Sequence, residues 1–275
     1  MSYLRSSSFL LLLALFAVPA FADDGKPLRF GSVAQDTPAV MQKRLLPLTT
    51  YLSKALNRPV VLKLSTDMPG AINALVTGDV DLAYLTPVAY VNAHARNKAQ
   101  LVVNMLTDGR PSFKLKIVVR EDSPIRKIED LAGKRFAFGD PAALLQRAVV
   151  VGAGMPLEHL GSYGFVKHYD NIVRGVLVGD YDAGIANDNT ARQWQGKGIR
   201  ILYDSEDLPP YNIAAAGGID QVTLNKLREA LLRLDPSIPE QKLIISALDD
   251  GYTGFVVAND ADYDVIRKLI KPFKK

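Results

Sequence analysis

Residues 75–85, LVTGDVDLAYL, indicate the fold more clearly than any other stretch of the sequence. A helical pattern ends at Gly78, a residue suited to the left-handed conformation that closes many helices. Asp81 then opens an apolar run of the length expected for a buried strand. The same order of features recurs at residues 176–186, VLVGDYDAGIA. The echo indicates either a repeated structural unit or the common chemistry of helix-to-strand loops.

Strand and helix patterns alternate on both sides of these two stretches. The expected strands are residues 28–34, 59–64, 80–85, 100–106, 114–120, 135–140, 162–167, 181–186 and 199–205. The expected helices are residues 38–56, 68–77, 86–97, 141–153, 169–178, 188–195, 220–233, 237–247 and 260–272, and residues 123–134 are expected to be a short capped helix and a turn. The alternation restarts near residues 107–113, so the sequence predicts two α/β units, each a largely parallel sheet flanked by helices.

The order of these elements predicts a two-lobed protein in which the chain leaves the first lobe and later returns to it. We expect residues 23–110 to begin lobe 1, residues 111–207 to form lobe 2, and residues 208–275 to return to lobe 1 and end in helices. The crossings are expected at residues 108–113 and 206–213, and residues 250–260 are expected to be a linker. A ligand would then bind between the lobes, at the carboxyl ends of the strands.

Residues 1–22 have the pattern of a secretory signal peptide, with a basic residue, an apolar run and a small-x-small cleavage site before Asp23. The alternatives are an uncleaved anchor or a buried helix. The chain has no cysteine and no later apolar run long enough for a membrane span. We therefore expect a periplasmic protein cleaved after Ala22. The net charge is +4 and the charges are well mixed. We expect no nucleic-acid partner, because a secreted protein seldom meets nucleic acid, and we expect a monomer.

Motifs for catalysis are missing from the sequence. The three histidines lack metal-ligand spacing, and there is no nucleophile elbow, P-loop or dinucleotide fingerprint. The sequence therefore predicts no enzyme, no cofactor and no metal site.

Polar and aromatic residues gather where the predicted strands end, as a small-molecule site requires. Several of them are also good helix caps, and capping alone would explain their positions. The candidate ligand-binding residues are Gln35, Asp67, Met68, Tyr84, Thr86, Ala142, Ala143, Leu144, Arg147, His168 and Asn187.

The stretch FGDPAALLQR, residues 138–147, resembles an anion cradle without hydroxyl groups. A strand is expected to end there and a helix to begin at Pro141, with Asp140 as its cap and free backbone N–H groups. We expect Arg147 to face solvent rather than the cleft.

Four stretches in this order resemble the phosphonate/phosphite-type periplasmic solute-binding proteins of ABC importers. They are residues 28–63, the segment GDVDLAYLTPVAYVNA (78–93), the segment EDLAGKRFAFGDP (129–141) and the segment KHYDNIVRGVLVGDYDAGIAND (167–188). The resemblance covers nearly the whole mature chain. It implies a type II two-lobed fold and delivery of a small solute to a membrane permease. It also implies that Tyr84 and His168 face the ligand.

The sequence departs from the family pattern where the ligand is expected. Ala143, Leu144 and Leu145 stand where the family usually has serine and threonine, and Met68-Pro69-Gly70 stands where Tyr-Ala-Gly is common. These changes favour a less charged and more apolar ligand than a phosphonate. The alternative function is a sensory module that presents a solute to a membrane sensor without transport.

Overall fold

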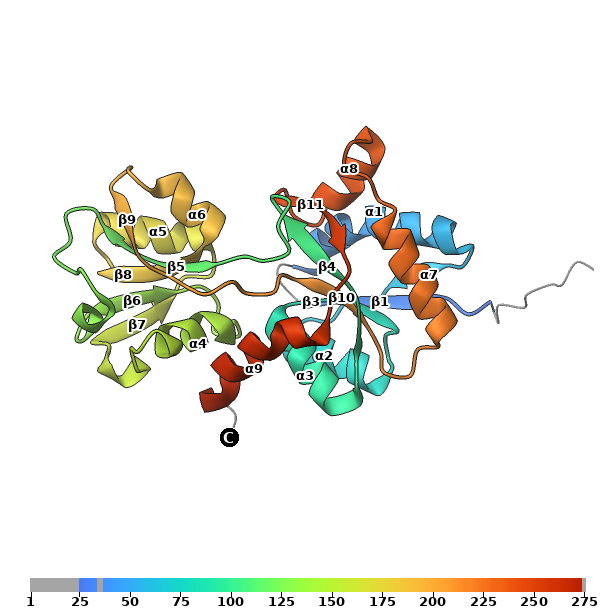
Figure 1. Cartoon of the computed structure of the whole chain (residues 1–275), viewed down its shortest axis with the longest axis horizontal. Helices are drawn as coiled ribbons and strands as arrows, with labels where there is room; N and C mark the ends of the chain where they lie inside the picture. The colour runs from blue at the N-terminus through green and yellow to red at the C-terminus, as the bar shows by residue number, and fades with distance from the viewer. Residues whose placement is uncertain (1–24, 34–36, 274–275) are drawn as a thin grey trace, which may run out of the picture.

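The computed structural model describes residues 25–33 and 37–273 of the chain. Figure 1 shows two α/β lobes side by side, each with a sheet enclosed by helices. Within the described residues, no helix combines the length and apolarity needed to cross a membrane. The predicted leader and Gln35 lie outside the described residues.

The first lobe contains a six-stranded sheet in the order β11-β4-β10-β3-β1-β2. Its strands are β1 (Leu28–Ser32), β2 (Val60–Leu62), β3 (Leu82–Leu85), β4 (Gln100–Thr107), β10 (Asn212–Ala215) and β11 (Tyr252–Val256). Its helices are α1 (Pro38–Leu56), α2 (Met68–Thr77), α3 (Pro87–Asn97), α7 (Gln221–Leu232) and α8 (Pro239–Ser246). One apolar core joins one face of the sheet to α2 and α3, and a second joins the other face to α1, α7 and α8.

The second lobe contains a five-stranded sheet in the order β7-β6-β8-β5-β9. Its strands are β5 (Leu115–Arg120), β6 (Arg135–Phe138), β7 (Ser162–Phe165), β8 (Ala183–Asn187) and β9 (Ile199–Asp204). Its helices are α4 (Leu144–Gly152), α5 (Tyr169–Val178) and α6 (Asp188–Trp194). Helix α4 packs on one face of this sheet, and α5 and α6 pack on the other.

The path of the chain brings the carboxyl ends of the parallel strands of the two sheets toward each other. Strand β4 leaves the first sheet at its carboxyl edge, and β5 enters the second sheet opposite the end of β8. On the way back, β10 enters the first sheet opposite the end of β3. The two connecting segments pair with each other through Phe113 and Leu208. Residues at these strand ends in either lobe therefore lie toward the same interlobe region.

The sequence echo corresponds to a structural unit that occurs once in each lobe. In the first lobe, Arg29 donates hydrogen bonds to both carboxylate oxygens of Asp81, at 2.8–3.0 Å, and to the carbonyl of Gly78. In the second lobe, Arg135 donates in the same way to Asp182 and to the carbonyl of Gly179. We call each arrangement an Arg–Asp clamp. Each clamp ties the start of one strand to the loop that leads into its parallel neighbour.

Three predictions about the elements are corrected by the structure. The sheets are mixed, because the strand that enters each lobe after a crossing runs antiparallel to its neighbours. The short helix expected within residues 123–134 is a 3₁₀ turn, Ile128–Leu131, because the Asp130 carboxylate accepts the N–H groups of Arg126 and Lys127. The expected linker at residues 250–260 contains β11, which pairs with β4.

The C-terminal segment connects the two lobes. After the 3₁₀ turn Asp260–Tyr263, helix α9 (Asp264–Ile270) contacts α3 of the first lobe and α4 of the second. Figure 1 shows α9 between the lobes. The Tyr263 hydroxyl donates to Asn104 of β4 at 2.6 Å in the buried core, which anchors the start of this segment in the first lobe.

Candidate ligand-binding site

Three tyrosines lie at the carboxyl edge of the first sheet. Tyr84 belongs to β3, Tyr211 directly precedes β10, and Tyr252 begins β11. The hydroxyls of Tyr84 and Tyr252 are 2.7 Å apart, and the rings of Tyr84 and Tyr211 stack with centroids 5.3 Å apart. Only 2% of Tyr84 is exposed, so its ring belongs to the core beneath this edge. The predicted ligand residue Tyr84 thus forms one member of a tyrosine cluster.

The tyrosine cluster presents neutral groups. Burial, and then the neighbouring hydroxyls of Tyr84 and Tyr211, raise the pKa of Tyr252 well above its ordinary value. A neutral phenol both donates and accepts a hydrogen bond, and its ring offers an apolar face. The first lobe therefore contributes hydroxyl and aromatic surface to this edge of the sheet.

Three of the predicted ligand residues cap helices. The carboxylate of Asp67 accepts the N–H of Gly70 at the start of α2, and the Thr86 hydroxyl accepts the N–H of Ala89 at the start of α3. The Asn187 side-chain oxygen accepts the N–H of Thr190, so Asn187 is the cap of α6. Met68, the first residue of α2, is half-buried against the core.

The loop before α4 differs from its predicted form. The helix begins at Leu144 rather than Pro141, and its cap is Ala143, which has no side-chain oxygen to offer. The Asp140 carboxylate accepts the N–H of Ala142 at 2.7 Å, and the Asp140 carbonyl accepts the N–H of Ala143. The N–H of Leu144 bonds to the Ala142 carbonyl. The three N–H groups expected to be free are therefore already hydrogen bonded within the loop.

Two neighbouring side chains hold this loop in place. Gln146 is buried, and its side-chain oxygen accepts the N–H of Gly139 at 2.7 Å. Arg147 donates to the Pro141 carbonyl at 2.6 Å, and its guanidinium lies 5.7 Å from the centroid of the Phe165 ring. Arg147 is half-buried and lies back over the loop.

The remaining candidate in the second lobe is His168. It caps α5 through its backbone and is exposed, and no side-chain bond holds its imidazole to another described residue. His168 lies next to the loop before α4 because β6 and β7 pair in parallel. The loop follows the end of β6, and His168 follows the end of β7.

A buried carboxylate between the lobes was absent from the sequence prediction of ligand residues. Asp188, whose side chain is 8% exposed, accepts hydrogen bonds from Arg192 on its own helix and from Arg110 at 3.2 Å. Arg110 belongs to a turn that is bonded to β11, because the N–H of Gly109 donates to the Thr253 hydroxyl. The Arg110–Asp188 pair therefore connects the first lobe to the second. No sequence pattern signals it, because the partners are far apart in the chain.

The fold and the placement of these residues define a class: a two-lobed α/β binding protein without an enzyme's catalytic constellation among the described residues. The chain matches the family described as "ABC transporter, phosphonate, periplasmic substrate-binding protein" over residues 30–263. It therefore belongs to this family of periplasmic solute-binding proteins, which serve ABC transporters and are not enzymes.

Relatives and solved structures agree with this assignment. The chain is 24% identical to the phosphate-import protein PhnD of Mycolicibacterium smegmatis, over 81% of this chain and 78% of the relative. It is 22% identical to the phosphonates-binding periplasmic protein of Escherichia coli, over 94% and 80% of the two chains. The structure of PhnD1 from Prochlorococcus marinus in complex with methylphosphonate superposes with a TM-score of 0.74 at 20% identity, covering 90% and 98% of the chains.

Proposed function

We propose that this protein captures a small organic solute between its lobes in the periplasm and delivers it to the permease of an ABC importer. In this proposal, residues 23–110 and 208–275 form one lobe and residues 111–207 form the other, and the leader is removed after Ala22. Family membership supports the transport role. The solute is neutral or carries a single charge, unlike the phosphonate, phosphite and phosphate named for relatives.

The loop before α4 carries the proposal about the ligand. A bound phosphonate dianion needs several donors, and each unsatisfied oxygen in a closed site costs roughly 1–3 kcal/mol. Residues 142–144 have no side-chain donor, and their N–H groups bond to Asp140 and Ala142. To hold a dianion with the N–H groups of residues 142–144, the loop would have to break these bonds.

The first lobe supports the same ligand class. Tyr211 and Tyr252 are the half-buried members of the tyrosine cluster, and their phenol and ring surface suits an uncharged or weakly charged organic group. Leu144 and Leu145 of the second lobe are half-buried and add apolar surface beside the loop. Phosphonate specificity needs stronger donors than these.

A thermal-shift screen of the mature protein tests the proposal. The panel contains phosphite, methylphosphonate, sulfonates, carboxylates, amines and neutral polar solutes. A true ligand at a hundred times its Kd adds about 2.7 kcal/mol to the free energy of unfolding. We expect this shift from a neutral or singly charged solute and none from methylphosphonate or phosphite. A shift with either phosphorus oxyanion would contradict the proposed ligand class.

Two histidine variants locate the bound solute. His168→Ala should lose the shift, because His168 lies at the proposed site. His159→Ala is the matched control, since His159 is also exposed but lies in a 3₁₀ turn at the other end of α4. Equal shifts in both variants would show that His168 takes no part.

A further inference from the structure

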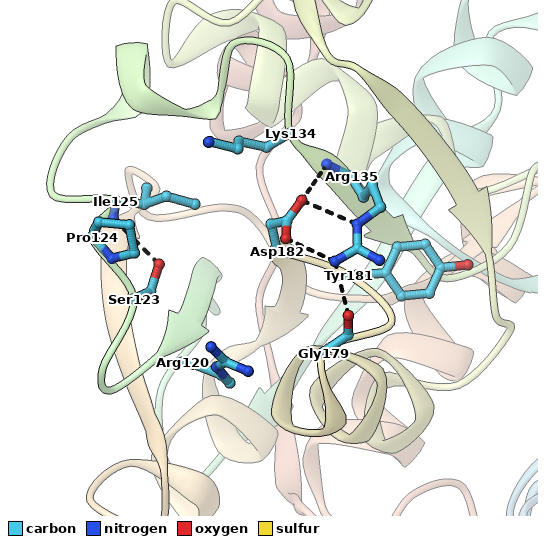
Figure 2. Close-up of a pocket in the computed structure, with 9 residues that line it drawn as sticks. All are labelled: Arg120, Ser123, Pro124, Ile125, Lys134, Arg135, Gly179, Tyr181 and Asp182. Atoms are coloured by element: carbon cyan, nitrogen blue, oxygen red, sulfur yellow. Dashed lines mark hydrogen bonds and ion pairs between the residues drawn. The ribbon is translucent and has the colours of Figure 1, made fainter.

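The pocket in Figure 2 lies away from the proposed solute site. It is found at the edge of the second sheet where β6 begins and β5 ends, opposite to the carboxyl ends of the parallel strands. Its wall is formed by Ser123-Pro124-Ile125 on one side and by the Arg–Asp clamp of the second lobe on the other. Neither the family nor the proposed transport function accounts for this pocket.

The repeated clamp shows which part of the pocket is structural. Arg135 and Asp182 make the same bonds as Arg29 and Asp81 in the first lobe, including the bond to a glycine carbonyl. Hydrogen bonds from Arg135 hold the pKa of Asp182 below its ordinary value, and the charge of Lys134 adds to the effect. The clamp charges therefore neutralise each other, and both lobes need them to join their strands.

Two further cations line the pocket and have no counterpart in the first lobe. Lys134 directly precedes Arg135, whereas the residue before Arg29 is the buried Leu28. Arg120 is the last residue of β5, the strand that pairs with β8, and the sheet registers place Ala216 at the corresponding position beside β3. The first lobe keeps its clamp without these two charges, so the fold does not require them.

Both additional cations retain unused donors. Lys134 is half-buried, and its ammonium makes no hydrogen bond or ion pair with a residue in the described ranges. Arg120 donates from Nε to the exposed Asp122 at 2.9 Å, and both terminal nitrogens are left for another partner. Figure 2 shows the two side chains on opposite sides of the pocket mouth, with Asp182 between them.

The wall of the pocket is fixed from behind. Arg200 donates to the carbonyl oxygens of Ser123, at 3.1 Å, and of Ile125. These two acceptors are thereby occupied and do not compete for Lys134 or Arg120. The pocket thus combines a fixed wall with ammonium and guanidinium donors, which together suit a planar or tetrahedral oxyanion.

We propose that this pocket binds a small oxyanion, held by Lys134 and Arg120 and separate from the solute site between the lobes. The proposal does not depend on the proposed transport function. Sulfate is the probe, because its charge and oxygen geometry match this class.

The test is an NMR titration of the isotopically labelled mature protein with sodium sulfate, with chloride as the matched salt at equal ionic strength. We expect saturable shifts of the Arg120 Nε–H and the Gly179 amide with sulfate only. The double variant Lys134→Leu with Arg120→Ala copies the residues of the first lobe. It should weaken sulfate binding by roughly tenfold or more, because it removes charge-assisted hydrogen bonds.

The control removes two charges elsewhere. Lys226→Ala with Lys242→Ala changes exposed residues of α7 and α8 and should leave the sulfate shifts unchanged. The single variant Lys134→Gln keeps the test valid if the double variant folds poorly, and it should also weaken binding. Shifts that do not saturate, that chloride reproduces, or that survive both Lys134 variants would overturn the proposal.

Discussion

At the scale of single residues, the Arg–Asp clamp is the clearest link between sequence and structure. Asp81 is partly buried, and burial alone would raise its pKa. Its hydrogen bonds with the side chain and backbone of Arg29 outweigh burial, so its pKa is lowered overall. The carboxylate therefore stays charged and stabilises the folded state above the pKa of the unfolded chain.

Asp81→Asn should lower the free energy of unfolding by about 1–2 kcal/mol at neutral pH, because charge-assisted bonds are lost. The difference from the wild type should shrink as the pH falls below about 4, where the unfolded chain takes up a proton that the native carboxylate, with its lowered pKa, still resists. Urea unfolding across pH 3–7 measures both effects.

Asp79→Asn is the matched control for this prediction. Asp79 lies two residues away, is exposed, and approaches Lys63 at only 3.8 Å. An exposed pair of this kind contributes little, so the variant should unfold like the wild type. An equal loss in both variants would show that the clamp has no special role.

At the scale of elements, the sequence predicts helix bounds correctly where the capping residues and the hydrophobic periodicity agree. The predicted bounds of α2 and α5 match the structure, because Asp67 caps the first and left-handed glycines close both. Strand β11 was missed, because Gly251 and Gly254 interrupt the strand pattern and its pairing with β4 is set by tertiary contact. The short helix expected near Asp130 is a 3₁₀ turn for a local reason, since the Asp130 carboxylate accepts backbone N–H groups there.

The segment that leads into α9 is anchored by a buried hydrogen bond from Tyr263. Tyr263→Phe removes the hydroxyl that donates to Asn104 at 2.6 Å and leaves that buried oxygen without its donor. The expected cost is about 1–3 kcal/mol in the free energy of unfolding, measured by urea denaturation. Tyr203→Phe, in half-exposed strand β9, should cost far less. Similar losses in both variants would contradict the anchoring role of Tyr263.

At the scale of the whole molecule, the two lobes are joined by paired crossings, by α9 and by the Arg110–Asp188 pair. The candidate site likewise combines local features with contacts between distant segments. Strand ends and caps pointed to Asp67, Thr86 and Asn187, because such positions can be recognised locally. The partners of Tyr84 and Asp188 come from segments far away in the sequence. The sequence could not predict these contacts, because they depend on how the sheets pack in three dimensions.

Arg110→Ala should separate the lobes in the absence of ligand, because it removes a charge pair between them. Small-angle X-ray scattering should show a larger radius of gyration than for the wild type. Arg192→Ala removes the other partner of the same carboxylate within the second lobe, so the radius should not change. The same radius for Arg110→Ala and the wild type would show that this pair does not hold the lobes together.

The loop at residues 142–144 supports the central claim about ligand class, and calorimetry with methylphosphonate tests that claim most directly. We expect no saturable heat from the mature wild-type protein at ligand concentrations up to roughly 1 mM, equivalent to less than about 4 kcal/mol of binding free energy. The variant Ala142→Ser, Ala143→Thr, Leu144→Ser supplies hydroxyl donors and should gain measurable affinity. Micromolar binding by the wild type would contradict the account.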